Sequence, residues 1–133
     1  MTAGLIDDGY CFVCGKSNPN GLKVEFKKTD NGVTAEFSAG KNLQGYKDIV
    51  HGGIIATVLD EASVKALLSR GIKAVTAEIT LRFKKTLFIN ENAIINADIG
   101  RERGRLYEIN AEIRKMDGEL IAQSSAKLFR HEE

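Results

Sequence analysis

The sequence of 133 residues lacks an excess of charge, a long apolar run and a secretion signal. Its 19 Lys and Arg residues nearly balance 18 Asp and Glu residues, which leaves a formal net charge of +1. This balance excludes a bulk field that recruits nucleic acid or an anionic membrane, so an anionic ligand would need a local basic cluster. The apolar runs are shorter than a membrane span, and residues 1–8 lack the basic and apolar regions of a leader. We therefore expect a cytoplasmic protein with no nucleic-acid or membrane partner.

Residues that commonly hold metals are also few. The sequence has two cysteines, Cys11 and Cys14, and two histidines, His51 and His131. The C-x-x-C spacing is compatible with a redox pair, with half of a zinc site, or with two small buried side chains. Zinc prefers four ligands and neither histidine has the spacing of a finger, so a complete site would need a second subunit or a coincidence of folding. We therefore expect no metal and no resident cofactor.

The length and the hydrophobic content of 43% predict one domain over residues 1–133 with a core of its own. Alternating apolar and polar residues predict six strands, at residues 22–26, 33–37, 75–83, 95–99, 107–113 and 120–129. Helical periodicity starts at Gly53 and continues to Arg70, and Gly71 follows in the position of a C-terminal cap. This order predicts an α+β fold in which an antiparallel sheet packs on one helix. Dimerisation would cover the other face and the edge of the sheet.

Two dipeptides in this pattern are typical of tight turns. Asn31-Gly32 lies between the first two predicted strands, and we expect it to adopt the positive φ angles of a two-residue hairpin. Asp117-Gly118 lies before the last predicted strand and has the same character.

The predicted helix begins at a glycine pair, Gly52-Gly53, and carries Asp60 two turns further on. Glycine in a helix loses backbone entropy, and a carboxylate on an apolar stripe must be desolvated or partnered, so neither choice favours folding. At about 100° per residue, four residues fall within roughly 40° of Asp60: Gly53, Ala56, Val64 and Leu67. Glu61 lies about 100° away and forms an i,i+4 pair with Lys65, so we expect it to be a solvated surface acid.

Asp60 is either a carboxylate satisfied by a hydroxyl of Thr57, Ser63 or Thr76, or a catalytic group. The glycine pair is either a tight turn or a helix start whose free N–H groups polarise a carbonyl oxygen. Gly53 and Asp60 are seven residues apart, about 10 Å along the axis, so one carbonyl group cannot contact both within a single chain. Two antiparallel helices across a twofold axis would bring them together.

Several motifs together resemble the hotdog-fold acyl-CoA thioesterases of the PaaI type. They are His51-Gly52-Gly53 before an apolar helix with Asp60, Cys11-Phe12-Val13-Cys14-Gly15, Asn18-Pro19-Asn20-Gly21-Leu22, and the strands at 76–83 and 118–129. The resemblance covers nearly the whole chain. It implies a curved antiparallel sheet wrapped around one long central helix, a homodimer, and often a dimer of dimers.

The resemblance also implies roles for individual residues. The Gly53 N–H, beside Gly52, would bind the carbonyl of an aromatic or medium-chain acyl-CoA, and Asp60 of the partner subunit would act as general base or nucleophile. Thr76 would orient the water, and the amide of Gln44 would face the carbonyl. His51 would form either a structural hydrogen bond or a substrate contact. Where the family usually has Phe-x-x-Pro, this chain has Phe83-Lys84-Lys85-Thr86, which leaves the shape of the acyl pocket open.

Coenzyme A is polyanionic and would enter as part of the substrate. A basic group formed by Arg101, Arg103 and Arg105 around Gly104, with Lys84 and Lys85, is a candidate phosphate contact, and the alternative is a solvated turn. No G-x-S-x-G elbow is present. A hydratase or dehydratase, and a non-catalytic acyl-CoA sensing module, are alternative functions on the same fold.

Overall fold

The computed structural model describes residues 4–131, and within them it contains one α-helix and six β-strands. The helix, α1, spans Gly52–Leu68, and a short 3-10 turn, η1, at Lys41–Leu43 precedes it. The strands are β1 (Lys27–Lys28), β2 (Gly32–Phe37), β3 (Ala74–Phe83), β4 (Ala93–Arg103), β5 (Leu106–Lys115) and β6 (Leu120–Arg130). No helix among the described residues is long and apolar enough to cross a membrane.

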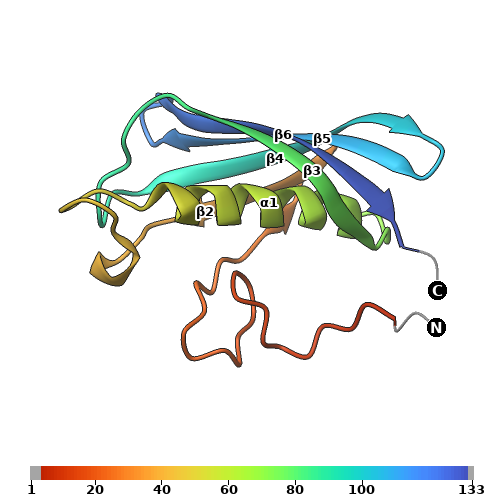
Figure 1. The fold of residues 1–133 in the computed structure, drawn as a ribbon, viewed down its shortest axis with the longest axis horizontal. Helices are drawn as coiled ribbons and strands as arrows, with labels where there is room; N and C mark the ends of the chain where they lie inside the picture. Colours follow the sequence, from red (N-terminus) through yellow and green to blue (C-terminus); the bar gives the residue numbers. More distant parts are fainter. Residues whose placement is uncertain (1–3, 132–133) are drawn as a thin grey trace.

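The strands form one antiparallel sheet in the order β1-β2-β4-β5-β6-β3. The chain leaves β2, passes through α1, forms β3 at the opposite edge, and then returns to the middle of the sheet with β4. Figure 1 shows the twisted sheet over one side of α1 and the N-terminal segment along the helix's other side. The residue patterns predict an antiparallel sheet packed on one helix, and the resemblance implies the curved sheet around it; the structure has both features.

The core lies between α1 and the sheet. Seven helix residues are buried there, and they recur at the spacing of one helix face: Ile55, Val58, Leu59, Ala62, Ser63, Ala66 and Leu67. Buried residues of the strands alternate with exposed ones, as in β4 and β5, because successive side chains point to opposite faces of a sheet. The period-2 and period-3.6 patterns of the sequence therefore produce one shared core.

Most predicted elements are confirmed with longer strands. Gly71 has a φ of +75°, and its N–H donates to the Leu68 carbonyl while the Ile72 N–H donates to the Leu67 carbonyl, which ends α1. Gly118 also has a positive φ, +96°, in the predicted turn before β6.

The first predicted hairpin is wrong in two respects. Residues 22–26 are not a strand, and only Lys27–Lys28 pairs with β2. The Asn31-Gly32 dipeptide does not adopt positive φ angles. Gly32 is instead the first residue of β2, where an added Cβ would overlap the carbonyl oxygen of Ala97 on β4. Close backbone approach, rather than turn conformation, requires the glycine.

Candidate active site

Asp60 and Thr76, both predicted from the sequence, lie together where α1 faces the start of β3. The Thr76 hydroxyl donates to Asp60 Oδ1 at 2.7 Å, and both residues are half-buried. Among the described residues nothing donates a hydrogen bond to the second carboxylate oxygen, Oδ2. The hydroxyl fixes the orientation of the carboxylate, and Oδ2 stays free to contact water or substrate.

The stripe through Asp60 lies at the rim of the buried helix face rather than at its centre. On this stripe Ala56 and Val64 are half-buried, Gly53 is exposed, and only Leu67 is fully buried. The core contacts come from the adjacent side of the helix, around Leu59. A rim position leaves the carboxylate partly desolvated and still accessible, which suits a group that exchanges a proton with water.

The glycine pair forms the first turn of α1, as predicted, and His51 is its N-cap. His51 Nδ1 accepts a hydrogen bond from the Gly53 N–H at 2.8 Å. The structural hydrogen bond, one of the two alternatives for His51, is therefore present. Gly52 lies beside the exposed ring of Phe83, and a Cβ added at Gly52 would be 3.7 Å from a carbon of that ring. The helix start thus has an aromatic neighbour from the end of β3.

Gln44 lies in the loop that leads to α1. Its Oε1 accepts a hydrogen bond from the Asp48 N–H at 3.1 Å, and its backbone forms an isolated bridge with Val50. A cavity of about 390 Å³ adjoins this loop and the helix start, lined by Gly45, Tyr46, Ile49, Val50, His51 and Gly52. The Gln44 amide therefore shapes the approach to the helix, and in this chain it is engaged with the loop itself.

β3 is an edge strand whose outer side has no neighbour among residues 4–131. Nine of its ten residues pair with β6, with an irregularity at Ala77, and most of its side chains are exposed or half-buried. Val75 and Phe83 near its two ends are 47% and 55% exposed. A long open edge with apolar side chains is one that soluble proteins normally cover. Asp60 and Thr76 therefore lie beside the part of the molecule best suited to receive another chain.

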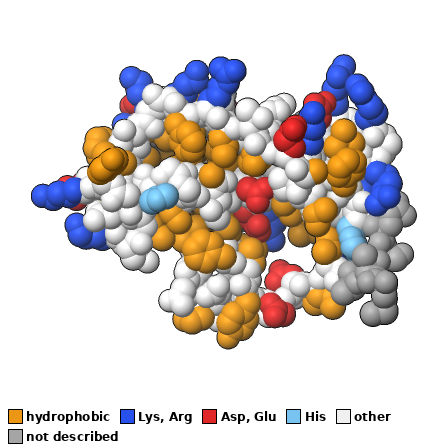
Figure 2. Space-filling model, viewed as in Figure 1, with side chains coloured by type: hydrophobic (Ala, Val, Ile, Leu, Met, Phe, Trp, Pro, Cys, Tyr) orange, Lys and Arg blue, Asp and Glu red, His pale blue; other side chains and the backbone are white. Residues whose placement is uncertain are grey.

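The basic residues do not form the single cluster that the sequence predicts. Lys84 and Lys85 follow β3, where their backbone N–H groups both donate to the Ile121 carbonyl at the start of β6. Arg101 and Arg103 lie near the β4–β5 turn, which neighbours the end of β6, and they line a hollow of about 220 Å³. The topology separates the two pairs along the length of the sheet, and Figure 2 shows Lys and Arg side chains at both ends of the molecule.

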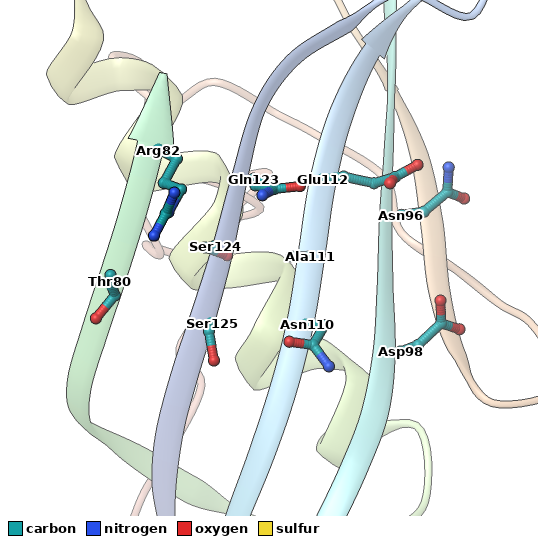
Figure 3. Close-up of a pocket in the computed structure, with 10 residues that line it drawn as sticks. All are labelled: Thr80, Arg82, Asn96, Asp98, Asn110, Ala111, Glu112, Gln123, Ser124 and Ser125. Carbon is teal, nitrogen blue, oxygen red and sulfur yellow. The ribbon is translucent and has the colours of Figure 1, made fainter. Parts of the chain in front are cut away.

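A polar hollow of about 300 Å³ lies on the face of the sheet that points away from α1 (Figure 3). Cross-strand neighbours form two rows there, one from Arg82 to Asn96 and one from Thr80 to Asp98. Glu112 in this hollow is bonded by Arg114 at 2.6 Å. The sheet itself separates the hollow from Asp60, so it is not part of the same site.

Glu61 is the residue whose surroundings the sequence missed. Its side chain is 18% exposed, because the N-terminal segment covers this side of α1. Its Oε2 lies 3.4 Å from the sulfur of Cys11 and 3.4 Å from that of Cys14, and 3.9 Å from Lys65 Nζ. The predicted pair with Lys65 exists, but it is not a solvated surface pair. The C-x-x-C spacing indicates that the two cysteines can share a further partner, but no sequence pattern identifies Glu61 as that partner.

The thiol of Cys14 is strongly affected by this environment. Burial, the hydrogen bond with Cys11 and the negative charge of Glu61 raise the pKa of Cys14 to about 12, so the thiol is protonated at neutral pH. The same contact with Cys14 raises the pKa of Lys65, although burial opposes it. A protonated thiol is a poor nucleophile, and this cluster does not supply one.

Comparisons with known proteins agree on the family. The thioesterase superfamily profile matches residues 47–122, which include the helix, Asp60 and Thr76. The acyl-coenzyme A thioesterase THEM4 of Mus musculus is 27% identical over 118 residues, covering 86% of this chain and 51% of the mouse protein. The chain spans about half the length of the curated relatives it matches.

Solved structures share the fold. A hypothetical thioesterase from Streptococcus pneumoniae, crystallised with coenzyme A, has a TM-score of 0.77 at 18% identity, over 83% of this chain and 90% of that chain. Two further structures of that protein each carry one replacement by alanine. One replaces an aspartate, and the other replaces a threonine sixteen positions later. The Escherichia coli PaaI protein has a TM-score of 0.77 at 20% identity, over 82% of this chain and 84% of that chain. With a family profile matching more than half of its residues and this architecture, the chain belongs to the thioesterase superfamily and has the hotdog fold.

Proposed function

We propose that this chain is an acyl-CoA thioesterase that hydrolyses a thioester to a free acid and coenzyme A. The observation that carries the proposal is the Thr76 hydroxyl bonded to Asp60 Oδ1 at a half-buried, open edge of the fold. Asp60 and Thr76 are sixteen residues apart, the same separation as the aspartate and threonine replaced in the S. pneumoniae protein. The name of the mouse relative and the coenzyme A in the pneumococcal structure support the same substrate class.

Asp60 is the general base in this proposal. Thr76 holds Oδ1, and the free Oδ2 takes a proton from a water molecule. The water oxygen bonds to the thioester carbon, the carbon–sulfur bond breaks, and the sulfur leaves as a thiolate that needs little acid assistance. Asp60 then returns its proton to solvent or to the thiolate. One base and one oxyanion donor are enough for this chemistry.

The oxyanion donor is the start of α1. The thioester oxygen competes with His51 Nδ1 for the Gly53 N–H. The Gly52 N–H lies in the same first turn and is a second donor at the start of the helix. His51 therefore holds the N–H group in place until substrate arrives. His51 Nδ1 already accepts the hydrogen bond from the Gly53 N–H, so the hydratase alternative lacks a free histidine base at this nitrogen.

The active unit is a homodimer joined through β3. Pairing of the two open β3 edges in antiparallel fashion would set the two α1 helices antiparallel as well, with Gly53 of one subunit near Asp60 of the partner subunit. The distance of about 10 Å between Gly53 and Asp60 along one helix requires such an arrangement.

A hydrolysis panel tests the proposed function. Acyl-CoA thioesters with phenylacetyl, benzoyl and medium-chain acyl groups are incubated with the full chain, and released coenzyme A is detected with a thiol reagent. We expect turnover of at least one aromatic or medium-chain member. Saturable binding of acyl-CoA without release of thiol would instead identify a sensing module, and absence of both would reject the substrate class.

The antiparallel dimer also predicts how the two basic pairs act. The end of one subunit that carries Lys84 and Lys85 meets the end of the partner that carries Arg101 and Arg103, so the predicted cluster forms between subunits. Replacing either pair with alanine should raise KM for acyl-CoA by roughly threefold to tenfold at low salt, with kcat nearly unchanged. Steady-state kinetics at two salt concentrations measure this effect. Lys27→Ala with Lys28→Ala, on the opposite edge, is the matched control, and an unchanged KM in both test variants would contradict the assignment.

A further inference from the structure

The turn at residues 11–15 brings two sulfur atoms to one side. The Cys14 N–H donates to Cys11 Sγ at 3.4 Å, and the Gly15 N–H donates to the Cys11 carbonyl at 2.8 Å. A Cβ added at Gly15 would overlap the backbone of Cys11 and Gly9, so only glycine fits at this position of the turn. A backbone amide aimed at sulfur stabilises negative charge on it, which is a feature of a thiolate ligand.

Glu61 of α1 meets these sulfurs from the other side. Its Oε2 lies 3.4 Å from each Sγ, and the three donor atoms all lie within 4.8 Å of one another. A tetrahedral zinc ion with Zn–S of about 2.3 Å and Zn–O of about 2.0 Å would separate sulfur from oxygen by about 3.5 Å. The observed separations match this value to within about 0.1 Å.

We propose that Cys11, Cys14 and Glu61 form a zinc site that fastens the N-terminal segment to the outer side of α1. The two thiols release their protons to solvent as the Zn–S bonds form, so the ligands carry three negative charges. The zinc ion contributes two positive charges, and Lys65, 3.9 Å from Glu61 Oε2, contributes the third. The loaded cluster is therefore neutral, which a half-buried position requires.

A cavity of about 620 Å³ adjoins the three ligands. They line it together with Lys65, with apolar residues of the N-terminal segment and of α1, and with the charged residues Asp7, Asp8 and Lys73. Figure 2 shows acidic side chains on this face of the molecule, where the N-terminal segment lies against the body. Water, or one donor atom of a molecule in the cavity, completes the tetrahedron.

A redox role for the cysteine pair is less consistent with this geometry. Both sulfurs converge on the oxygen of Glu61. Without a metal ion, a carboxylate beside a thiol disfavours the thiolate that disulfide exchange needs, whereas a bound zinc ion stabilises the thiolates. The site is also separate from the reaction proposed above. Glu61 follows Asp60 directly, but the two side chains leave the helix about 100° apart. The zinc ion would hold the segment at residues 4–26 against α1, because this segment contains no helix or strand of its own.

Metal content and cobalt spectroscopy test the proposal on the full chain, purified under reducing conditions. Elemental analysis should find about one zinc ion per chain, and Co²⁺ should give sulfur-to-cobalt charge transfer with the intense visible bands of a tetrahedral site. The double variant Cys11→Ser with Cys14→Ser should lose both signals. Glu61→Gln should keep a weaker charge-transfer band and bind metal at least about tenfold less tightly.

Matched variants keep the test independent of folding and of catalysis. Glu36→Gln on β2 is an exposed acid and should bind metal as wild type does. Asp60→Asn should also bind metal normally, so loss of hydrolysis and loss of zinc are separate results. Circular dichroism of each variant confirms that it is folded. Metal binding by wild type no tighter than by the cysteine double variant would overturn the proposal, as would oxidation to a disulfide that zinc does not prevent.

Discussion

Replacing Asp60 with asparagine should lower kcat for acyl-CoA hydrolysis by at least about a hundredfold, with only a modest change in KM. Asparagine has nearly the same shape, and its carbonyl oxygen can still accept the hydrogen bond that Thr76 donates over 2.7 Å. It cannot take a proton from water. The variant therefore removes the base and leaves the binding site intact, which is the pattern expected for an interaction made in the transition state.

Matched variants separate this effect from a general loss of charge. Asp98→Asn changes an exposed carboxylate on the far face of the sheet and should leave kcat unchanged. Thr76→Val removes the hydroxyl but keeps the volume, and kcat should fall less than in Asp60→Asn, because the carboxylate remains but loses its fixed orientation. Steady-state kinetics of the three variants on one thioester from the hydrolysis panel measure these differences. Full turnover by Asp60→Asn would show that the base is another group.

The fold and half of the candidate site follow from sequence patterns because those patterns are local. The spacing of apolar residues places α1 and four long strands, since helix and strand repeats can be read within ten to fifteen residues. Asp60 stands out on its helix because a carboxylate near an apolar face needs a partner, and Thr76 is one of three hydroxyls that the sequence offered. Periodicity thus singles out Asp60 and leaves three candidate hydroxyl partners, and the family resemblance points to Thr76 among them.

The remaining features depend on contacts between distant segments. Glu61 looks like the outer member of a surface pair with Lys65, and only the path of the N-terminal segment across α1 brings two cysteines against it. Those cysteines precede Glu61 by 50 and 47 residues. No periodic pattern encodes a contact of that range, so the third ligand could not be read from the chain.

The arrangement of the strands in the sheet also explains why the predictions for the basic residues and for the first hairpin are wrong. The sequence does not reveal that β3 lies at one edge while β4 lies in the middle of the sheet, so it does not show that Lys84 and Arg101 are far apart. Residues 22–26 alternate like a strand, yet Val24 is buried without ladder pairing. Alternation reports which side chains face the core, and it does not report whether a neighbouring strand exists.

Mixing Asp60→Asn subunits with Gly53→Pro subunits should restore activity that neither variant has alone. Proline removes the N–H that the substrate oxygen needs, at a helix position whose N–H makes no intrahelical bond. In a mixed dimer, the Gly53 N–H of the Asp60→Asn subunit meets the intact Asp60 of the partner subunit. One of the two sites is then complete and the other has both defects, so purified mixed dimers should have about half of wild-type activity.

Unfractionated mixtures give a second measure, because random exchange makes about half of the dimers mixed and restores about one quarter of wild-type activity. Two different affinity tags allow the mixed dimers to be purified and their stoichiometry to be checked by mass. The proline variant also loses the hydrogen bond to His51, so its melting temperature must be compared with that of His51→Ala, which loses the same cap. If each chain carried its own complete site, mixed dimers would be as inactive as the two parents. Recovery therefore requires that Gly53 and Asp60 act from different subunits, which is what their separation along one helix demands.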